Sequence, residues 1–408
     1  MTIDLQAPVR LVNDLHMLTG LTIAYGDAEH HESMSVGLQR EIFESNGRFE
    51  SKEQPITERT IYDLASLTKL FTCVSVFLLL ENRVIRMTDC IGALDPRFKH
   101  LKDISVYDCL CYRAALQSPQ RIDAQPNAEL AEKQVFEIFP SLKARTKIYS
   151  DMNALVLKYV IEAVSQQRYI DFLQEHLLGP LNMAETWGAV PPDRRDDCMN
   201  YNYEHSIIGG QYRINRQVPQ GTVHDPKARI LDRGDGNTSG HAGLFSTKDD
   251  MIRFAQGLLS GKVISQSSLG TIGINRTGCL KQNGEYRQYM GFLCFSKSAV
   301  PRLSEVPLWM GEKAFGLSGY TGNHIAVDPE LGVFDLLLGN RCHHRLSTIL
   351  PAEDASILSL HADGSGAVDW PGGRRVYSSY QYVYLKDKLI HEPIYRRMCS
   401  LGWINAGR

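Results

Sequence analysis

The stretch "DLASLTKLFTCVSVFLLL", residues 63–80, is polar in its first half and apolar in its second half. The apolar half has the composition of a buried helix, and Ser66 and Lys69 stand at the head of that predicted helix. Lysine is rarely buried unless another group pairs with it or uses it. A lysine at the head of a buried helix, as Lys69 is predicted to be, therefore needs a chemical explanation.

Residues three apart on a helix lie on one face, with about 5–6 Å between their Cβ atoms, so Ser66 and Lys69 can touch. A serine hydroxyl is a poor nucleophile until a neighbouring group takes its proton. Burial disfavours the ammonium form and lowers the pKa of a lysine. We therefore expect a neutral Lys69 amine that deprotonates Ser66. Because this spacing also occurs by chance in helices, the pair needs support from other segments.

Two other segments supply that support. "KIYSDMN", residues 147–153, places Tyr149 and Asp151 just before a predicted helix, and "FGLSGYTGNHIAVDP", residues 315–329, places a glycine-rich turn beside a strand. Together with the serine–lysine pair, this layout resembles the penicillin-recognising serine hydrolases. Within them it resembles the class C β-lactamase-related branch of esterases, D-aminopeptidases and acyltransferases. The resemblance runs from about residue 21 to residue 345 and includes the stretches "VHDPKARIL" and "SGHAGLFSTKDDMIRFAQGLL".

The resemblance implies a role for each matching residue. Ser66 matches the nucleophile, Lys69 its base, and Tyr149 the phenol that helps move the proton toward the leaving group. Asp151 takes the position that asparagine usually holds.

The same resemblance implies an oxyanion hole made by the backbone N–H groups of Ser66 and Tyr320. Tyr320 follows the triplet Leu317-Ser318-Gly319 on the third segment. We expect Gly319 to let this strand approach Ser66 closely, because a side chain there would obstruct the acyl group.

The sequence departs from the family pattern at three places. Leu317 stands where a lysine, histidine or other polar residue is usual, and Asp151 puts an anion where a substrate amide is normally held. Both changes argue against recognition of β-lactams and peptidoglycan peptides. Arg113, in "CYRAALQ" (residues 111–117), stands where the branch shows a Thr-Ser-Gly turn. It either binds an acid group in the cleft or is a solvated arginine on the rim.

His224-Asp225 and His241 match the elements "VHD" and "GHAG" of the branch. Sequence adjacency says little about a catalytic triad, which is a spatial arrangement. We expect His241 to be a buried hydrogen-bonding group at a glycine-flanked turn, with lining of the cleft as the alternative. The chain has no G-x-S-x-G motif, so nothing in it supports the nucleophile elbow of the α/β-hydrolases.

Strand patterns flank a helical middle, and this order predicts an α+β fold. Residues 21–27 and 33–42 are predicted strands, as are 289–296, 324–329 and 332–340, and helices are predicted at 153–164, 169–178 and 246–261. The resemblance implies a β-lactamase/transpeptidase-like fold in which an antiparallel sheet flanked by helices carries an inserted all-helical domain. We assign residues 1–75 and 250–350 to the sheet domain, 76–249 to the helical domain, and 351–408 to an extension packed on the sheet domain.

Composition excludes several classes of protein. The 408 residues carry a formal net charge of −2 and are 43% hydrophobic, so we expect no nucleic-acid partner. The longest apolar run, residues 71–80, is about half of a membrane-spanning helix, and the first twenty residues lack a secretory pattern. We therefore expect a cytoplasmic protein without a membrane partner.

The nine cysteines are scattered and include no C-x-x-C pair, which is typical of reduced, core-filling thiols. "RCHHR" places Cys342, His343 and His344 together, but adjacent residues rarely chelate one metal. We expect no metal and no cofactor.

The leading interpretation is a serine hydrolase that forms an acyl-enzyme on a small-molecule ester or amide. An acyltransferase or a D,D-peptidase of the same fold remains an alternative. A non-catalytic binding protein that keeps the fold is a third, motivated by Leu317 and the segment 111–117. The intact set of Ser66, Lys69 and Tyr149 argues against a pure binding protein, which has no physical reason to keep them together.

Overall fold

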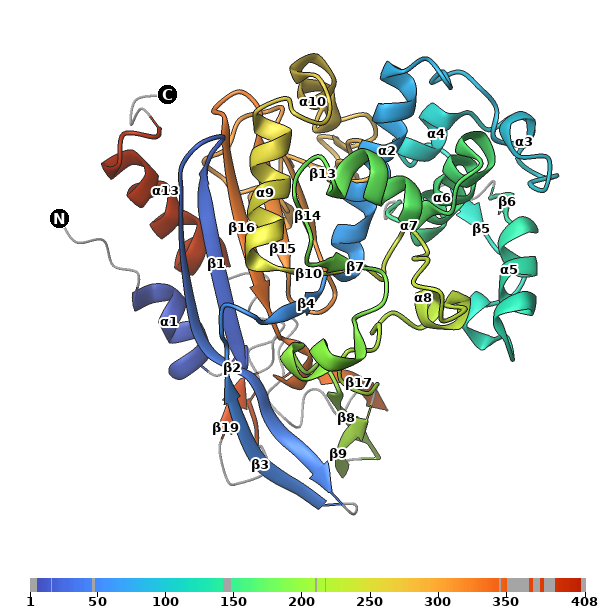
Figure 1. The fold of residues 1–408 in the computed structure, drawn as a ribbon. Coiled ribbons are helices and arrows are strands. Elements are labelled where there is room, and N and C mark those ends of the chain that lie inside the picture. Colours follow the sequence, from blue (N-terminus) through green and yellow to red (C-terminus); the bar gives the residue numbers. More distant parts are fainter. Residues whose placement is uncertain are drawn as a thin grey trace.

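The central sheet joins segments from the two ends of the sequence (Figure 1). In the computed structural model, seven antiparallel strands follow the order β13-β14-β15-β16-β1-β2-β3. Ala24 on β1 faces Leu336 on β16, so the expectation that the early and late strands share one sheet is confirmed. The strands are β1 (Gly20–Asp27), β2 (His31–Ser45), β3 (Arg48–Pro55), β13 (Phe295–Ser296), β14 (Phe315–Ser318), β15 (His324–Asp328) and β16 (Val333–Gly339).

The structure describes residues 6–15, 17–45, 48–141, 148–209, 211–216, 218–344, 346–350, 367–369, 375–377 and 386–404. Much of the predicted extension 351–408 therefore lies outside the described residues. The domain boundaries proposed from the sequence stay predictions.

Each face of the sheet is covered by different helices, because side chains alternate along a strand. Ala24 and Leu336 point into the main core, which helices α2 (Thr68–Glu81) and α9 (Lys248–Leu259) share. Ile23 and Leu337 point to the opposite face. Helices α1 (Gln6–Asn13) and α13 (Glu392–Ser400) cover that face.

Helix α2 connects the sheet to the helical part of the molecule. Eleven of its fourteen residues are buried, so the apolar run that follows Lys69 forms the middle of the main core. It packs on α6, which begins at Asp151. The helical part further comprises α4 (Val106–Leu110), α5 (Ala128–Phe136), α6 (Asp151–Ser165), α7 (Tyr169–Leu173) and a π-helical turn at Gln174–Leu178.

Most of the predicted elements are confirmed. Helix α9 begins after Thr247, whose side chain accepts the Asp250 N–H as a cap. Strands β15 and β16 form the predicted hairpin. The strand expected at 289–296 is wrong for most of its length. The Gly291 N–H donates to the Cys294 carbonyl in a turn, and Leu293 has a φ of 52°, which leaves only β13 as a strand.

Two small sheets lie beside the central one and carry residues of the candidate site. One joins β4 (Ile61–Asp63), β10 (Phe245–Thr247) and β7 (Thr186–Trp187), and the other joins β17 (Leu346–Leu350), β8 (Tyr203–Ile208) and β9 (Gln211–Arg216). None of the helices in the described ranges is both long enough and apolar enough to cross a membrane.

Candidate active site

Ser66 lies in a short 3₁₀ turn between β4 and α2, at the wall of a cavity of about 450 Å³. The preceding Ala65 has a φ of 48°, a left-handed conformation that costs a non-glycine residue on the order of 1 kcal/mol. The Asp63 carboxylate accepts the Ala65 N–H at 2.9 Å and holds this turn in place. The strained turn presents the Ser66 hydroxyl to the cavity instead of burying it in the helix.

Lys69 lies directly beneath Ser66 and is completely buried. Its Nζ atom is 3.0 Å from Ser66 Oγ, 2.8 Å from Asp151 Oδ1 and 3.1 Å from the His241 carbonyl oxygen. The serine–lysine contact predicted from the helical spacing is therefore present.

The protonation state expected for Lys69 is wrong. Burial alone disfavours the ammonium, but the Asp151 carboxylate outweighs that effect, and the pKa of Lys69 is raised above its usual range. The pKa of Asp151 is held well below its usual range; burial opposes this, and the Lys69 ammonium is the strongest of the cations that outweigh it. Lys69 is therefore a charged ammonium in the resting protein.

Asp151 also contacts a second cation that the sequence argument did not identify. Lys227, at the start of α8 (Pro226–Leu231), is 2.9 Å from Asp151 Oδ2 and 3.6 Å from Asp225 Oδ2. Asp225 in turn lies 3.0 Å from His241 Nε2. Alternating positive and negative groups thus extend from Ser66 into the floor of the cavity.

Tyr149 lies beside both members of the pair. The centre of its ring is 4.9 Å from the Lys69 Nζ, and its side chain lines the same cavity as Ser66. The ring stacks on Phe295 with 5.3 Å between centroids. Burial raises the pKa of Tyr149, so the phenol keeps its proton and can donate it.

The third segment approaches Ser66 from the end of β14. A Cβ atom on Gly319 would lie 2.9 Å from the Leu64 carbonyl oxygen, so glycine permits the expected close approach. Tyr320 lines the cavity and is 37% exposed. The Ser318 hydroxyl points elsewhere, to Glu305 Oε2 at 2.5 Å, and Leu317 is buried in the main core.

Neither His241 nor Arg113, both predicted site residues, lines the cavity. His241 is fully buried, where Ser239 Oγ lies 3.0 Å from Nδ1 and Asp225 Oδ1 lies 3.0 Å from Nε2, as expected of a structural histidine. Its carbonyl reaches Lys69 instead. The Arg113 guanidinium is exposed and lies 5.8 Å from the centre of the Tyr107 ring. The structure gives no support for Arg113 as an acid-binding group in the cleft.

Asp63 is the most connected site residue that the sequence argument missed. Besides the Ala65 N–H, it accepts the His224 N–H at 2.7 Å, and its carbonyl accepts hydrogen bonds from Thr321 and Asn323. Burial raises its pKa to about 6. One buried aspartate thus connects the turn that carries Ser66 to two other walls of the cavity. No motif marks it, because its partners in those two walls, His224, Thr321 and Asn323, are more than 150 positions away in the sequence.

The charges of this site disfavour a metal ion between Asp151, Asp225 and His241, although their ligand atoms lie within 4.8 Å of one another. Lys69 and Lys227 already neutralise the two carboxylates. A metal ion would have to enter beside two ammonium groups.

The chain belongs to the β-lactamase family, whose model matches residues 39–349. It is 25% identical over 317 residues to a Salmonella enteritidis protein named "Putative D-alanyl-D-alanine carboxypeptidase", covering 70% of this chain and 71% of that protein. Its fold is similar to that of a class C β-lactamase, with a TM-score of 0.60, 15% identity and coverage of 95% and 96% of the two chains. It is also similar to the fold of EstCE1, "a hydrolase with promiscuous acyltransferase activity", with a TM-score of 0.62, 15% identity and coverage of 82% and 92%.

These findings confirm the resemblance and the α+β fold class expected from the sequence. The family and its members indicate a serine hydrolase of the β-lactamase fold.

Proposed function

We propose that this protein is a serine hydrolase that acts through an acyl-enzyme on an ester or amide of a small molecule, with Ser66 as the nucleophile. The observation that carries the proposal is the contact of Ser66 Oγ with Lys69 Nζ at 3.0 Å, at the wall of a cavity. A charged lysine that is completely buried is costly to keep. Its place beneath a cavity-facing serine in a turn strained at Ala65 supports a catalytic use.

In the proposed reaction, the neutral amine of Lys69 takes the Ser66 proton as Oγ attacks the carbonyl carbon. The carbonyl electron pair moves onto oxygen, where the N–H groups of Ser66 and Tyr320 would stabilise it. The bond to the leaving group then breaks; the Tyr149 phenol gives its proton to that group and takes in its place the proton that Lys69 received from Ser66, so that both residues are restored. Water repeats the sequence on the acyl-enzyme and releases the acid.

Asp151 sets the fraction of the protein in which Lys69 is neutral and can act as the base. Because Asp151 stabilises the Lys69 ammonium, the neutral amine is a minor form at neutral pH. The proposal therefore implies a reaction that speeds up as the pH rises.

The fully buried Leu317 favours esters over peptides that end in a carboxylate. It provides no cation at the position where the family usually holds a polar residue. The name of the curated relatives favours a D,D-carboxypeptidase as the second candidate.

Hydrolysis of p-nitrophenyl butyrate and of a peptide ending in D-Ala-D-Ala tests the proposal. We expect ester turnover that Ser66→Ala abolishes and Tyr149→Phe strongly reduces, with little peptide turnover. If the peptide alone is hydrolysed, the proposed function becomes that of a D,D-carboxypeptidase and not that of an esterase. Ester turnover that survives in Ser66→Ala would contradict the proposal.

A further inference from the structure

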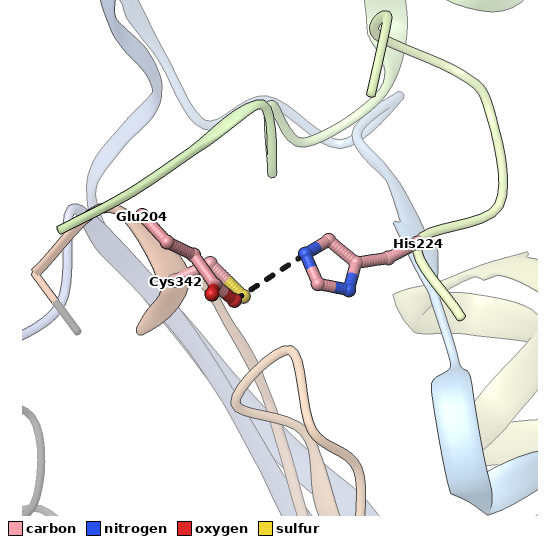
Figure 2. Close-up of side chains that lie close together, drawn as sticks. All are labelled: Glu204, His224 and Cys342. Carbon is pink, nitrogen blue, oxygen red and sulfur yellow. Dashed lines mark ion pairs between the residues drawn. The ribbon is translucent and has the colours of Figure 1, made fainter. Parts of the chain in front are cut away.

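A second cluster of reactive side chains lies in the cavity wall, apart from the Ser66–Lys69 pair. Glu204 on β8, His224 just before α8 and Cys342 after β16 bring one carboxylate oxygen, one imidazole nitrogen and one sulfur within 4.8 Å of one another (Figure 2). All three side chains are buried, and they come from three distant segments. Cys342 stands next to His343 and His344 in the sequence, whereas this cluster joins Cys342 to residues far from it in the sequence.

The buried Glu204 carboxylate is the main indication that a cation binds here. Glu204 is only 4% exposed, and its Oε1 atom accepts no hydrogen bond from the side chains and backbone that the structure describes. Across the same described residues, no lysine or arginine nitrogen lies within 4.0 Å of it, whereas His224 Nε2 lies at 3.5 Å. A buried carboxylate normally needs a cationic partner or a metal ion, because burying an isolated charge is costly.

The three kinds of ligand atom indicate which cation this cluster would bind. A thiolate and an imidazole are ligands of zinc and related transition metals, and a carboxylate completes many such sites. A tetrahedral zinc ion with bonds of about 2.0–2.3 Å needs donor atoms roughly 3.3–3.8 Å apart, and the 3.5 Å between Glu204 and His224 falls in that range. Calcium and magnesium would leave the sulfur without a role.

The cluster is also held in place and accessible. The Asp63 carboxylate fixes the His224 backbone at 2.7 Å, and the His224 ring stacks on Tyr320 with 5.2 Å between centroids. Glu204 and His224 both line the same cavity as Ser66, and Cys342 is fully buried close to them. A metal ion could therefore enter through the cavity and keep a free coordination position toward it.

We propose that Glu204, His224 and Cys342 form a binding site for a thiophilic divalent cation of the zinc class in the wall of the active-site cavity. Binding displaces the thiol proton of Cys342 to solvent, so affinity rises with pH. The proposal does not depend on the acyl-enzyme chemistry of Ser66.

Cobalt(II) tests the site directly, because it binds zinc sites and gives a thiolate charge-transfer band when sulfur coordinates it. The experiment uses the full chain, reduced and stripped with a chelator, with the partly exposed Cys90, Cys279 and Cys399 changed to serine to remove adventitious thiols. We expect one equivalent of cobalt to bind with that band, and zinc to displace it. Absence of the band in this folded protein would overturn the proposal.

Two variants assign the ligands. Cys342→Ser should abolish the charge-transfer band, and His224→Gln should keep the thiol but weaken cobalt binding at least tenfold. Cys294→Ser, another fully buried thiol outside the cluster, is the matched control and should bind as the parent does. A band that persists in Cys342→Ser, or unchanged affinity in His224→Gln, would overturn the assignment. Circular dichroism identifies any variant that fails to fold, and the remaining variant then decides.

Discussion

At the scale of single residues, the charge of Asp151 governs the chemistry of Lys69. Burial disfavours the Lys69 ammonium, and the Asp151 carboxylate, with a further contribution from Tyr149, outweighs it. The pKa of Lys69 is therefore raised, and the neutral amine that the proposed reaction needs is a minor form at neutral pH that becomes more abundant as the pH rises.

Replacing Asp151 by asparagine should lower the pKa of Lys69, because the stabilising anion is lost while burial remains. We expect the alkaline rise of kcat/KM to move to lower pH by more than about one pH unit in Asp151→Asn. A pH–rate profile of ester hydrolysis measures this, with the exposed Asp193→Asn as the control. An unchanged profile, or a shift to higher pH, would exclude Lys69 as the base.

Gly319 tests the close approach of β14 to the nucleophile turn. An alanine Cβ would lie 2.9 Å from the Leu64 carbonyl oxygen, and backbone atoms cannot easily move away. We expect Gly319→Ala to slow acylation roughly 10²–10³-fold, the loss typical of a displaced oxyanion donor. Gly270→Ala is the matched control, since nothing lies within 4 Å of its Cβ position. Equal acylation rates in the two variants would show that the approach does not matter.

Residues inside contiguous motifs could be predicted from the sequence, whereas residues that meet only on folding could not. Ser66 and Lys69 are three positions apart, so helical geometry alone predicts their contact. Asp63 and His224 are 161 positions apart, and no local pattern pairs them. The prediction of a neutral Lys69 was wrong for the same reason. Asp151, which stabilises the ammonium, lies on another helix.

At the scale of secondary-structure elements, the C-terminal segment supports the strand that flanks the site. Lys386, which precedes a π-helical turn and α13, is almost completely buried. Its Nζ is 2.9 Å from Glu305 Oε2 and 3.3 Å from Ser318 Oγ, at the end of β14. Burial disfavours the Glu305 carboxylate, but Lys386 outweighs this and lowers the pKa of Glu305.

Removing Lys386 should therefore leave a poorly solvated carboxylate beside β14. We expect Lys386→Met to lower the free energy of unfolding by roughly 3 kcal/mol near pH 7 and to slow acylation. The loss should shrink as the pH falls from 7 toward about 4, because the Glu305 carboxylate, once it has lost Lys386, takes up a proton more readily. Urea denaturation at several pH values measures the effect. The added change Glu305→Gln should restore stability, and a failure to do so would rule out the ion pair as its source.

Elements with clear periodicity could be predicted, such as α9 and the β15–β16 hairpin. The segment 289–296 could not, because a short apolar run does not distinguish a strand from a buried turn. Its tertiary position, with the Gly291 N–H and the Cys294 carbonyl closing a turn, decided the outcome.

At the scale of the whole molecule, the C-terminal helix α13 packs against the N-terminal strand β1 on the outer face of the sheet. Ile394 and Met398 of α13 pack in one buried cluster with Leu21 and Ile23 of β1. The buried contact of His391 Nδ1 with Asp335 Oδ2 at 2.6 Å adds a polar link between this segment and β16. The C-terminal helix is thus part of the same folded body as the site.

Truncating Ile394 should test this packing without touching the cavity. We expect Ile394→Ala to lower the free energy of unfolding by about 2–4 kcal/mol, as is typical for a fully buried aliphatic side chain. The rate of ester hydrolysis per folded molecule should stay close to that of the wild type. Chemical denaturation and active-site titration measure the two quantities. A stability change below about 0.5 kcal/mol would show that α13 is not part of the cooperative core.

The most direct test of the central claim is the intact mass of the protein after brief exposure to a fluorophosphonate and, in parallel, to a short-chain activated ester. The account predicts a single covalent adduct on the wild type, absent from a folded Ser66→Ala protein. It also predicts faster labelling at higher pH, since the reactive form needs a neutral Lys69. A folded wild type that takes up neither reagent, or equal labelling of Ser66→Ala, would contradict the proposed acyl-enzyme.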